Sequence, residues 1–193
     1  MAEGWDQLAI TWEKDESNIE FAEKAFAELM KKVSPEGCHV LDFGCGTGLL
    51  SQFISPHAKS IVALDASESM IEELDKKELV NVEPVVDSLT RGLVAQHPAF
   101  RKQFDLIVAC SVCGWLPHLA ESLTVAYSLL DQGGQFVHWD FISDDEDRAS
   151  GVGMVEMQDE LIQAGFADVH VSRVFKITCG HKQISVMMGI ATK

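Results

Sequence analysis

Short apolar runs alternate with amphipathic helical segments along most of this 193-residue chain. The expected strands are residues 39–43, 60–64, 82–86, 104–109 and 135–139, and the expected helices between and after them are 47–54, 67–77, 91–97, 116–130 and 154–164. Such alternation indicates βαβ units and a parallel sheet covered by helices on both faces. The last two apolar runs, 169–175 and 184–191, have no helix between them, so we expect them to pair as a hairpin.

The N-terminal part has a different pattern. Apolar residues recur at helical spacing from Phe21 to Val33, and Ser34-Pro35-Glu36-Gly37 ends the helix. We expect one α/β domain, residues 34–193, with residues 1–33 packed on it as a helical cap or lid. The acidic run at residues 144–147 is expected to be a solvated loop.

Composition and net charge limit the classes of function that this chain can have. The chain is 47% hydrophobic and 23% charged, which fits a globular protein with a core, and its net charge of -15 disfavours nucleic acid as a partner. No stretch resembles a secretion signal or approaches the length of a membrane span, and the five cysteines have no regular spacing. We therefore expect a cytoplasmic protein, monomeric or homodimeric, that does not bind membranes.

The segment from Val40 to Leu50 contains three glycines at alternate positions between a buried strand and a helix. Glycines there allow a sharp turn and close approach of a ligand to the main chain. A dinucleotide fingerprint fails because Leu49 occupies its third glycine position. Asp42, two residues before Gly44, favours a ligand with a positively charged amino-acid end, such as S-adenosylmethionine. The alternative is a connecting loop that binds nothing.

Two further carboxylates follow expected strands. Asp65 lies 21 residues beyond Gly44, where a carboxylate can accept hydrogen bonds from both hydroxyls of a ribose. Alternatively, it caps the helix that begins near Ser67. Asp87 ends the next strand and could accept the amino group of an adenine. Three acidic strand ends in succession favour a nucleoside ligand.

Together with the strand at residues 104–109 and the later Leu129-Leu130-Asp131-Gln132-Gly133-Gly134, these features make the chain resemble the class I S-adenosylmethionine-dependent methyltransferases, especially small bacterial single-domain members. The resemblance implies a Rossmann-like, doubly wound, seven-stranded sheet of order 3-2-1-4-5-7-6 with strand 7 antiparallel. It implies methyl transfer by in-line displacement, with S-adenosylhomocysteine as product. The cofactor-binding positions that it implies are Asp42, Gly44, Cys45, Gly46, Gly48, Leu49, Asp65, Ala66, Met70, Asp87, Ser88, Leu89 and Cys110.

Cys110 and Cys113 have the C-x-x-C spacing of a redox pair or half a zinc site. Similarity to the family instead places this segment at the end of strand 4, lining the cofactor and acceptor sites. No Asn follows Asn81, so the Asp/Asp/Asn magnesium site of catechol-type enzymes is missing. We expect no metal cofactor.

The sequence says less about the methyl acceptor than about the cofactor. Trp12, Trp115 and Trp139 could meet over the strand ends and, with His118, form a substrate pocket for a small neutral or cationic molecule. His118, His138 and Asp140 are weak candidates for catalysis, since an isolated histidine is more often structural. A non-catalytic S-adenosylmethionine-binding or protein-interaction module with the same fold remains the alternative.

Overall fold

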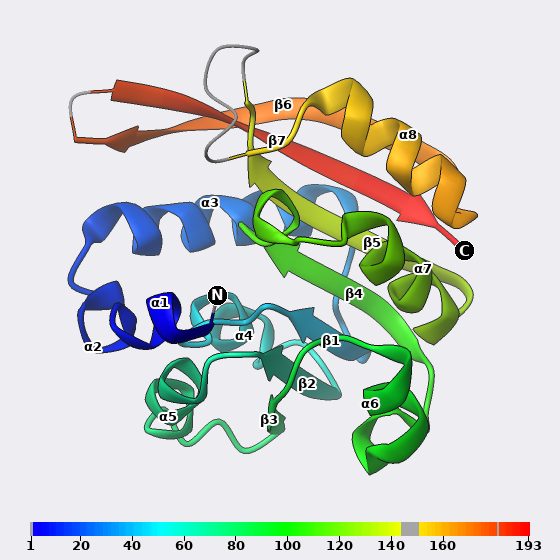
Figure 1. The fold of residues 1–193 in the computed structure, drawn as a ribbon, viewed down its shortest axis with the longest axis horizontal. Helices are drawn as coiled ribbons and strands as arrows, with labels where there is room; N and C mark the ends of the chain where they lie inside the picture. Colours follow the sequence, from blue (N-terminus) through cyan, green and yellow to red (C-terminus); the bar gives the residue numbers. More distant parts are fainter. Residues whose placement is uncertain (1, 144–150, 181) are drawn as a thin grey trace.

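The computed structural model describes residues 2–143, 151–180 and 182–193, and these form one seven-stranded sheet of order β3-β2-β1-β4-β5-β7-β6 (Figure 1). The first five strands pair in parallel, whereas β7 is antiparallel to both β5 and β6. The expected strand order and direction are confirmed. The strands are β1 His39–Phe43, β2 Ser60–Asp65, β3 Val82–Val86, β4 Phe104–Cys110, β5 Leu130–Phe141, β6 Ala167–Cys179 and β7 Lys182–Thr192.

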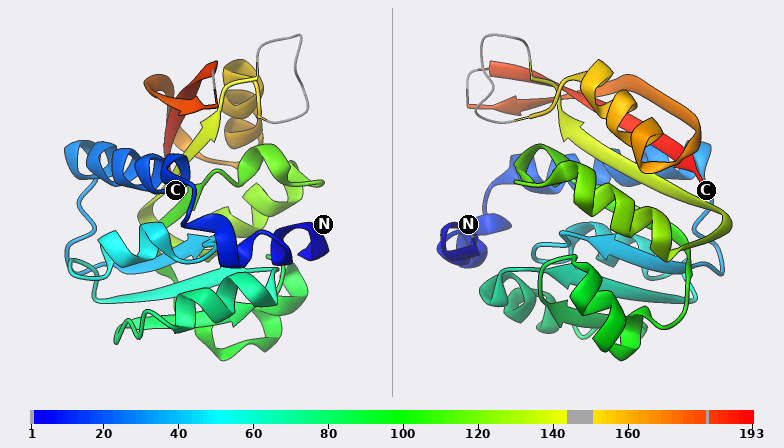
Figure 2. Two further views of the ribbon diagram at one scale, coloured as in Figure 1. Left: turned by 90° about the vertical axis from the view of Figure 1, so that its left-hand side faces the viewer. Right: turned by 45° about the vertical axis from the view of Figure 1, so that its right-hand side comes forward.

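Helices cover both faces of the sheet. In the left view of Figure 2, α3 and α4 lie on one side of the sheet and α7 and α8 on the other. The α-helices are α1 Ala2–Asp6, α2 Ala9–Trp12, α3 Glu16–Lys32, α4 Leu49–Ile54, α5 Glu68–Asp75, α6 Arg91–Gln96, α7 Leu119–Leu129 and α8 Met154–Ala164, with 3-10 turns η1 Pro98–Phe100 and η2 Cys113–Trp115. No helix in the described ranges is both long and apolar enough to cross a membrane.

Local chemistry explains where several helices begin and end. Asp15 caps α3 by accepting from the Ser17 N–H, and Ser67 caps α5 by accepting from the Met70 N–H. Gly165 ends α8 in the left-handed conformation that favours glycine. The helix expected from residue 116 begins only at Leu119, because Leu116 is extended ahead of Pro117.

The two faces of the sheet bury separate apolar clusters. On one face Phe21, Ala25 and Leu29 of α3 pack with Val108 and Trp139. On the opposite face α6, α7 and α8 pack over residues such as Leu41, Ile107 and Phe136. Because α3 contributes to the core, it is a layer of the domain. The expected cap of residues 1–33 stays a prediction, and within it residues 2–15 do not belong to this core cluster.

The second half of the sheet is longer than expected. β5 begins at Leu130 and passes through a register shift opposite Phe104 and Leu106 before regular pairing starts at Gln135. β6 and β7 both extend beyond the expected ranges and pair from Ala167 to Cys179. The acidic run at residues 144–147 lies outside the described residues.

Candidate functional site

A cavity of about 720 Å³ lies at the carboxyl ends of β1 to β5. This volume falls within the range of roughly 300–1,000 Å³ typical of small-molecule sites. In parallel sheets with this kind of strand order, ligands bind at such strand ends. Except for Gly48, every residue expected to bind the cofactor contributes to the lining: Asp42, Gly44, Cys45, Gly46, Leu49, Asp65, Ala66, Met70, Asp87, Ser88, Leu89 and Cys110.

The glycine-rich turn is shaped by close packing as well as by access to the cavity. Gly44 and Gly48 have φ angles of +70° and +78°. A Cβ at Gly44 would lie 2.4 Å from Val112, and one at Gly48 would lie 2.2 Å from Leu74. Gly48 therefore serves the packing of α4 against α5, and it does not line the cavity.

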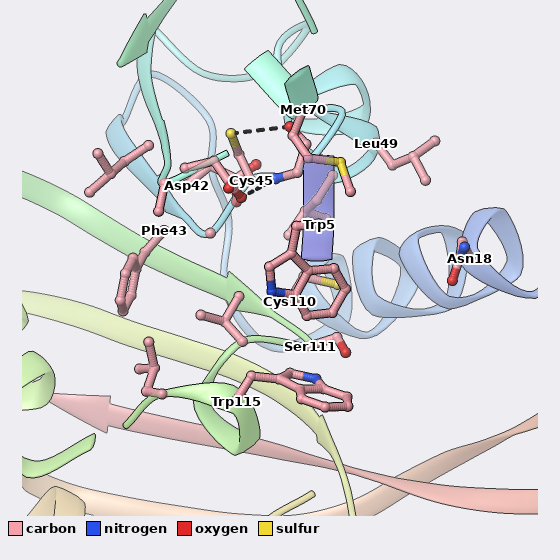
Figure 3. A pocket seen from close by; sticks show the side chains of 18 of the residues that line it. Trp5, Asn18, Asp42, Phe43, Cys45, Leu49, Met70, Cys110, Ser111 and Trp115 are labelled. Carbon is pink, nitrogen blue, oxygen red and sulfur yellow. Dashed lines mark hydrogen bonds between the residues drawn. The ribbon is translucent and has the colours of Figure 1, made fainter. Parts of the chain in front are cut away.

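Asp65 links the glycine-rich turn to the start of α5 beneath the cavity. One carboxylate oxygen accepts from the Gly46 N–H at 2.9 Å, and the other accepts from the Ser67 N–H at 2.9 Å (Figure 3 shows the loop). Burial raises the pKa of Asp65, and the backbone hydrogen bonds oppose that effect. Since a carboxylate has about four acceptor positions, Asp65 retains capacity for two more hydrogen bonds.

Asp42 is the most deeply buried acid of the cavity wall. One oxygen accepts from the Ser51 hydroxyl at 2.6 Å, while Oδ1 is buried with no hydrogen-bond partner. Burial raises the pKa of Asp42 to about 6, and the Ser51 bond only partly compensates. A buried acceptor without a partner is costly, so this oxygen is suited to a positively charged or hydrogen-bond-donating group of a ligand.

The segment before α3 lies against the same loops. The Thr47 hydroxyl donates to Glu13 at 2.7 Å, and Glu13 also forms an ion pair with Lys77 at 2.7 Å. Farther back, Asp6 accepts from the Ser67 hydroxyl. Two carboxylates of this segment thus bond to the glycine-rich turn and to the start of α5.

Three tryptophans gather over the cavity. Trp5 meets Trp12 edge-to-face, with ring centroids 5.8 Å apart, and meets Trp115 in the same way at 5.5 Å. Figure 3 shows Trp5 between Met70 and Trp115. Trp12, Trp115 and His118 line the cavity as expected. Trp5 was not expected there.

The expected place of Trp139 in the pocket is wrong. Its side chain is 0% exposed and packs beneath α3 in the core. Side chains of a strand alternate between faces, and Trp139 falls on the face that α3 covers. Because it stops below the strand end, it does not reach the cavity.

His138 and Asp140 also lie away from the cavity wall. His138 Nδ1 and Asp140 Oδ2 are 2.8 Å apart in the core, and Asp140 Oδ1 accepts from the Gly114 N–H at 3.1 Å. Asp140 therefore supports η2, which presents Trp115, and neither side chain lines the cavity. His138 and Asp140 are therefore no longer candidates for catalysis, and of the three residues proposed from the sequence His118 remains.

The two cysteines of the C-x-x-C segment lie in different places. Cys110 lines the cavity, whereas Cys113 is buried on the other face of the sheet. Possible ligand atoms of Cys113, His138 and Asp140 lie within 4.8 Å of one another. In this group the His138 and Asp140 atoms already bond to each other, and no group of this kind includes Cys110 in the described part of the chain.

Several lining residues were not expected from the sequence. They come from the N-terminal helices, α7, β5 and β6: Trp5, Asp15, Asn18, Phe21, Glu121, Phe141, Ile177 and Cys179. The one available signal was the pair Trp5 and Trp12, seven residues apart in a polar segment. The other residues depend on how distant elements pack.

Comparisons with known proteins identify the middle of the chain. Residues 41–136 match a family model described as a methyltransferase domain. An uncharacterized methyltransferase of Schizosaccharomyces pombe is 36% identical over 72 residues, covering 37% of this chain and 22% of that protein. A ubiquinone biosynthesis O-methyltransferase of Pseudomonas entomophila is 28% identical over 107 residues, covering 54% and 45%. The chain thus spans less than half the length of these curated relatives.

Solved structures share the fold. A complex titled DhpI-SAM-HEP superposes with a TM-score of 0.74 and 19% identity, covering 97% of this chain and 94% of that one. At this identity the similarity concerns the fold. It nevertheless extends over 97% of this chain, well beyond the range 41–136 of the family match.

Proposed function

Because the chain belongs to the class I S-adenosylmethionine-dependent methyltransferases, we propose that it transfers a methyl group from S-adenosylmethionine to a small-molecule acceptor. The observation that carries this proposal is the pair of carboxylates at adjacent strand ends. Asp65 has two acceptor positions free, and Asp42 has a buried oxygen with no partner. Bound S-adenosylmethionine would supply a methyl group activated on a sulfonium.

The residues over β1–β3 fit the parts of this cofactor. Asp65 would accept both ribose hydroxyls, and Asp87 would accept the adenine amino group. Asp42 would balance the ammonium charge of the methionine end, with Gly44 and Gly46 leaving the main chain accessible. We refer to this part of the lining, from Asp42 to Leu89, as the cofactor half.

The remaining lining would hold the acceptor. This acceptor half includes Trp5, Trp12, Asp15, Ser111, Trp115, His118, Glu121 and Phe141. In-line displacement at a methyl group requires mainly proximity and alignment. Residues 2–15 would serve as a lid that excludes water, since Asp6 and Glu13 bond to both cofactor loops.

Three observations favour a small acceptor. The cavity measures about 720 Å³, the net charge is -15, and a matched relative is named for ubiquinone biosynthesis. No step in this proposal requires a metal ion. A non-catalytic cofactor-binding module would have the same cofactor half, and only turnover distinguishes the two functions.

The test has two stages. Calorimetric titration should show stoichiometric binding of S-adenosylhomocysteine, and absence of binding contradicts the proposal. S-adenosylmethionine should then be incubated with pools of small molecules, bulk RNA and protein, and S-adenosylhomocysteine release recorded. Release that depends on a small molecule supports the proposal. Binding without release from any pool supports the non-catalytic alternative.

A further inference from the structure

The charged side chains that line the cavity all have one sign. Five carboxylates contribute to it: Asp15, Asp42, Asp65, Asp87 and Glu121. No lysine or arginine does so among the described residues. The three acids of the cofactor half have proposed cofactor partners. Asp15 and Glu121 belong to the acceptor half and are not accounted for by the cofactor.

These two acids stand on the elements that carry the tryptophans. Asp15 follows α2, which ends at Trp12, and Glu121 lies in the first turn of α7, shortly after Trp115. Asp15 accepts from the backbone and hydroxyl of Ser17, and these hydrogen bonds lower its pKa. It therefore remains ionised at neutral pH. Both carboxylates thus line the same cavity as the three tryptophans.

The tryptophan rings themselves favour positive charge. Trp12 and Trp115 both meet Trp5 edge-to-face, at interplanar angles of 81° and 88°, so the three rings form one cluster whose faces are not parallel. Trp115 is 39% exposed, which leaves part of its surface free for a ligand. The negative face of an aromatic ring attracts cations, and tryptophan does so most strongly.

Resting on the proposed methyl transfer, we propose that the acceptor is a small amine that enters the acceptor half as an ammonium ion, held by Trp5, Trp12 and Trp115 and by the charges of Asp15 and Glu121. The reactive form is the neutral amine. The ammonium ion loses its proton to water at the cavity mouth, beside the exposed His118. The nitrogen lone pair forms the new N–CH3 bond as the S–CH3 bond breaks, and the electron pair of that bond goes to sulfur.

Three probes of similar shape separate charge from shape: phenethylamine, 2-phenylethanol and 3-phenylpropionate. Binding is measured to the protein saturated with S-adenosylhomocysteine, and release of S-adenosylhomocysteine is measured with S-adenosylmethionine present. We expect phenethylamine to bind about tenfold more tightly than the alcohol, with the carboxylate weakest, and to be the one probe that is methylated. Equal binding of the three probes, no binding by any of them, or tighter binding of the alcohol or carboxylate overturns the inference.

Variants test the residues named. Trp115→Leu should reduce the preference for amine over alcohol about fivefold, whereas Trp115→Phe should retain most of it. Glu121→Gln should reduce the preference about threefold, and Glu72→Gln, an exposed change outside the cavity, should leave it unchanged. A preference that survives both Trp115→Leu and Glu121→Gln contradicts the assigned residues.

Failure of this inference can be told apart from failure of the proposed function. Absence of S-adenosylhomocysteine binding to the unmodified protein would contradict the proposed methyltransferase function itself. Intact cofactor binding, with methylation of a phenol, an RNA or a protein and none of amines, would remove only the amine inference.

Discussion

The two halves of the cavity are constructed in different ways. The cofactor half uses backbone turns and carboxylates that follow successive strands, and its residues occur in three short segments between Asp42 and Leu89. The acceptor half gathers side chains from elements far apart in the sequence, including Trp5 and Phe141. The first arrangement is fixed by local sequence and suits a constant ligand. The second depends on tertiary packing, so its specificity can change without disturbing the first.

The largest effect is expected from Asp65→Ala in the cofactor half. Loss of two charge-assisted hydrogen bonds should weaken S-adenosylhomocysteine binding about 100-fold. The Gly46 and Ser67 N–H groups also lose their acceptor, which should lower the free energy of unfolding by about 1–3 kcal/mol. Calorimetry and urea unfolding measure the two effects. Asp75→Ala, an exposed change on α5, is the control. An unchanged affinity of Asp65→Ala for S-adenosylhomocysteine would contradict the assignment of Asp65 to the ribose.

Asp42→Asn should separate stability from binding. Its folded pKa of about 6 lies above the ordinary 3.8, so the folded state holds the extra proton between these values. The protonated Asp42 carboxyl therefore makes its full contribution to the free energy of unfolding below about pH 4. This contribution, about 3 kcal/mol, is lost as the pH rises through 6. A neutral Asn that keeps the Ser51 bond should recover up to this amount at pH 7.5, yet weaken cofactor binding.

Urea unfolding of the ligand-free protein from pH 4.5 to 7.5 measures this effect. The stability gained by Asp42→Asn should grow with pH over that interval. A difference that is independent of pH would show that the Asp42 carboxyl is not held in its protonated form by burial.

Trp139→Phe should affect the core without affecting the acceptor half. The smaller ring leaves space beneath α3, and we expect a loss of about 1–3 kcal/mol in the free energy of unfolding. The ratio of amine to alcohol binding should not change. A changed ratio would mean that Trp139 reaches the acceptor, contrary to its buried position.

The smallest effect is expected at the contact between the lid and the cofactor half. Glu13→Gln weakens the bonds to Thr47 and Lys77, and because this contact is partly exposed it should cost only about 0.5–1 kcal/mol. Amide hydrogen exchange near Trp12 should become faster, and cofactor binding should weaken a few-fold. Glu23→Gln on the exposed side of α3 is the control. Equal exchange in the two variants would argue against a lid held by Glu13.

The contrast between the halves also explains what the sequence could predict. The glycine-rich turn and the positions of Asp42 and Asp65 follow from contiguous patterns, and both aspartates line the cavity. The strand order was implied by the resemblance to the family. Trp139 was misplaced because the expected strand ended there, whereas β5 runs on to Phe141, and Phe141 lines the cavity. A cap formed by residues 1–33 stays a prediction, because the apolar stripe of α3 does not say whether this helix packs as a cap or as a layer of the core.

Residues such as Asp15 and Glu121 gave no signal at all. Each is an exposed acid in the first turn of a helix or just before it, a common arrangement that favours the helix whatever the function. Their place on the cavity wall depends on the position of α3 and α7 relative to the sheet. That position is a tertiary property that no local pattern records.

Two thiols stand beside the carboxylates of the cavity, and this has a consequence for the proposed binding of an alkylating cofactor. Burial, reinforced by the charge of Asp42, raises the pKa of both Cys45 and Cys110 well above the ordinary range. The thiolate is the nucleophilic form of cysteine, so both side chains stay unreactive at neutral pH. The same negative field that would attract a cationic acceptor would thereby protect the protein from methylating itself.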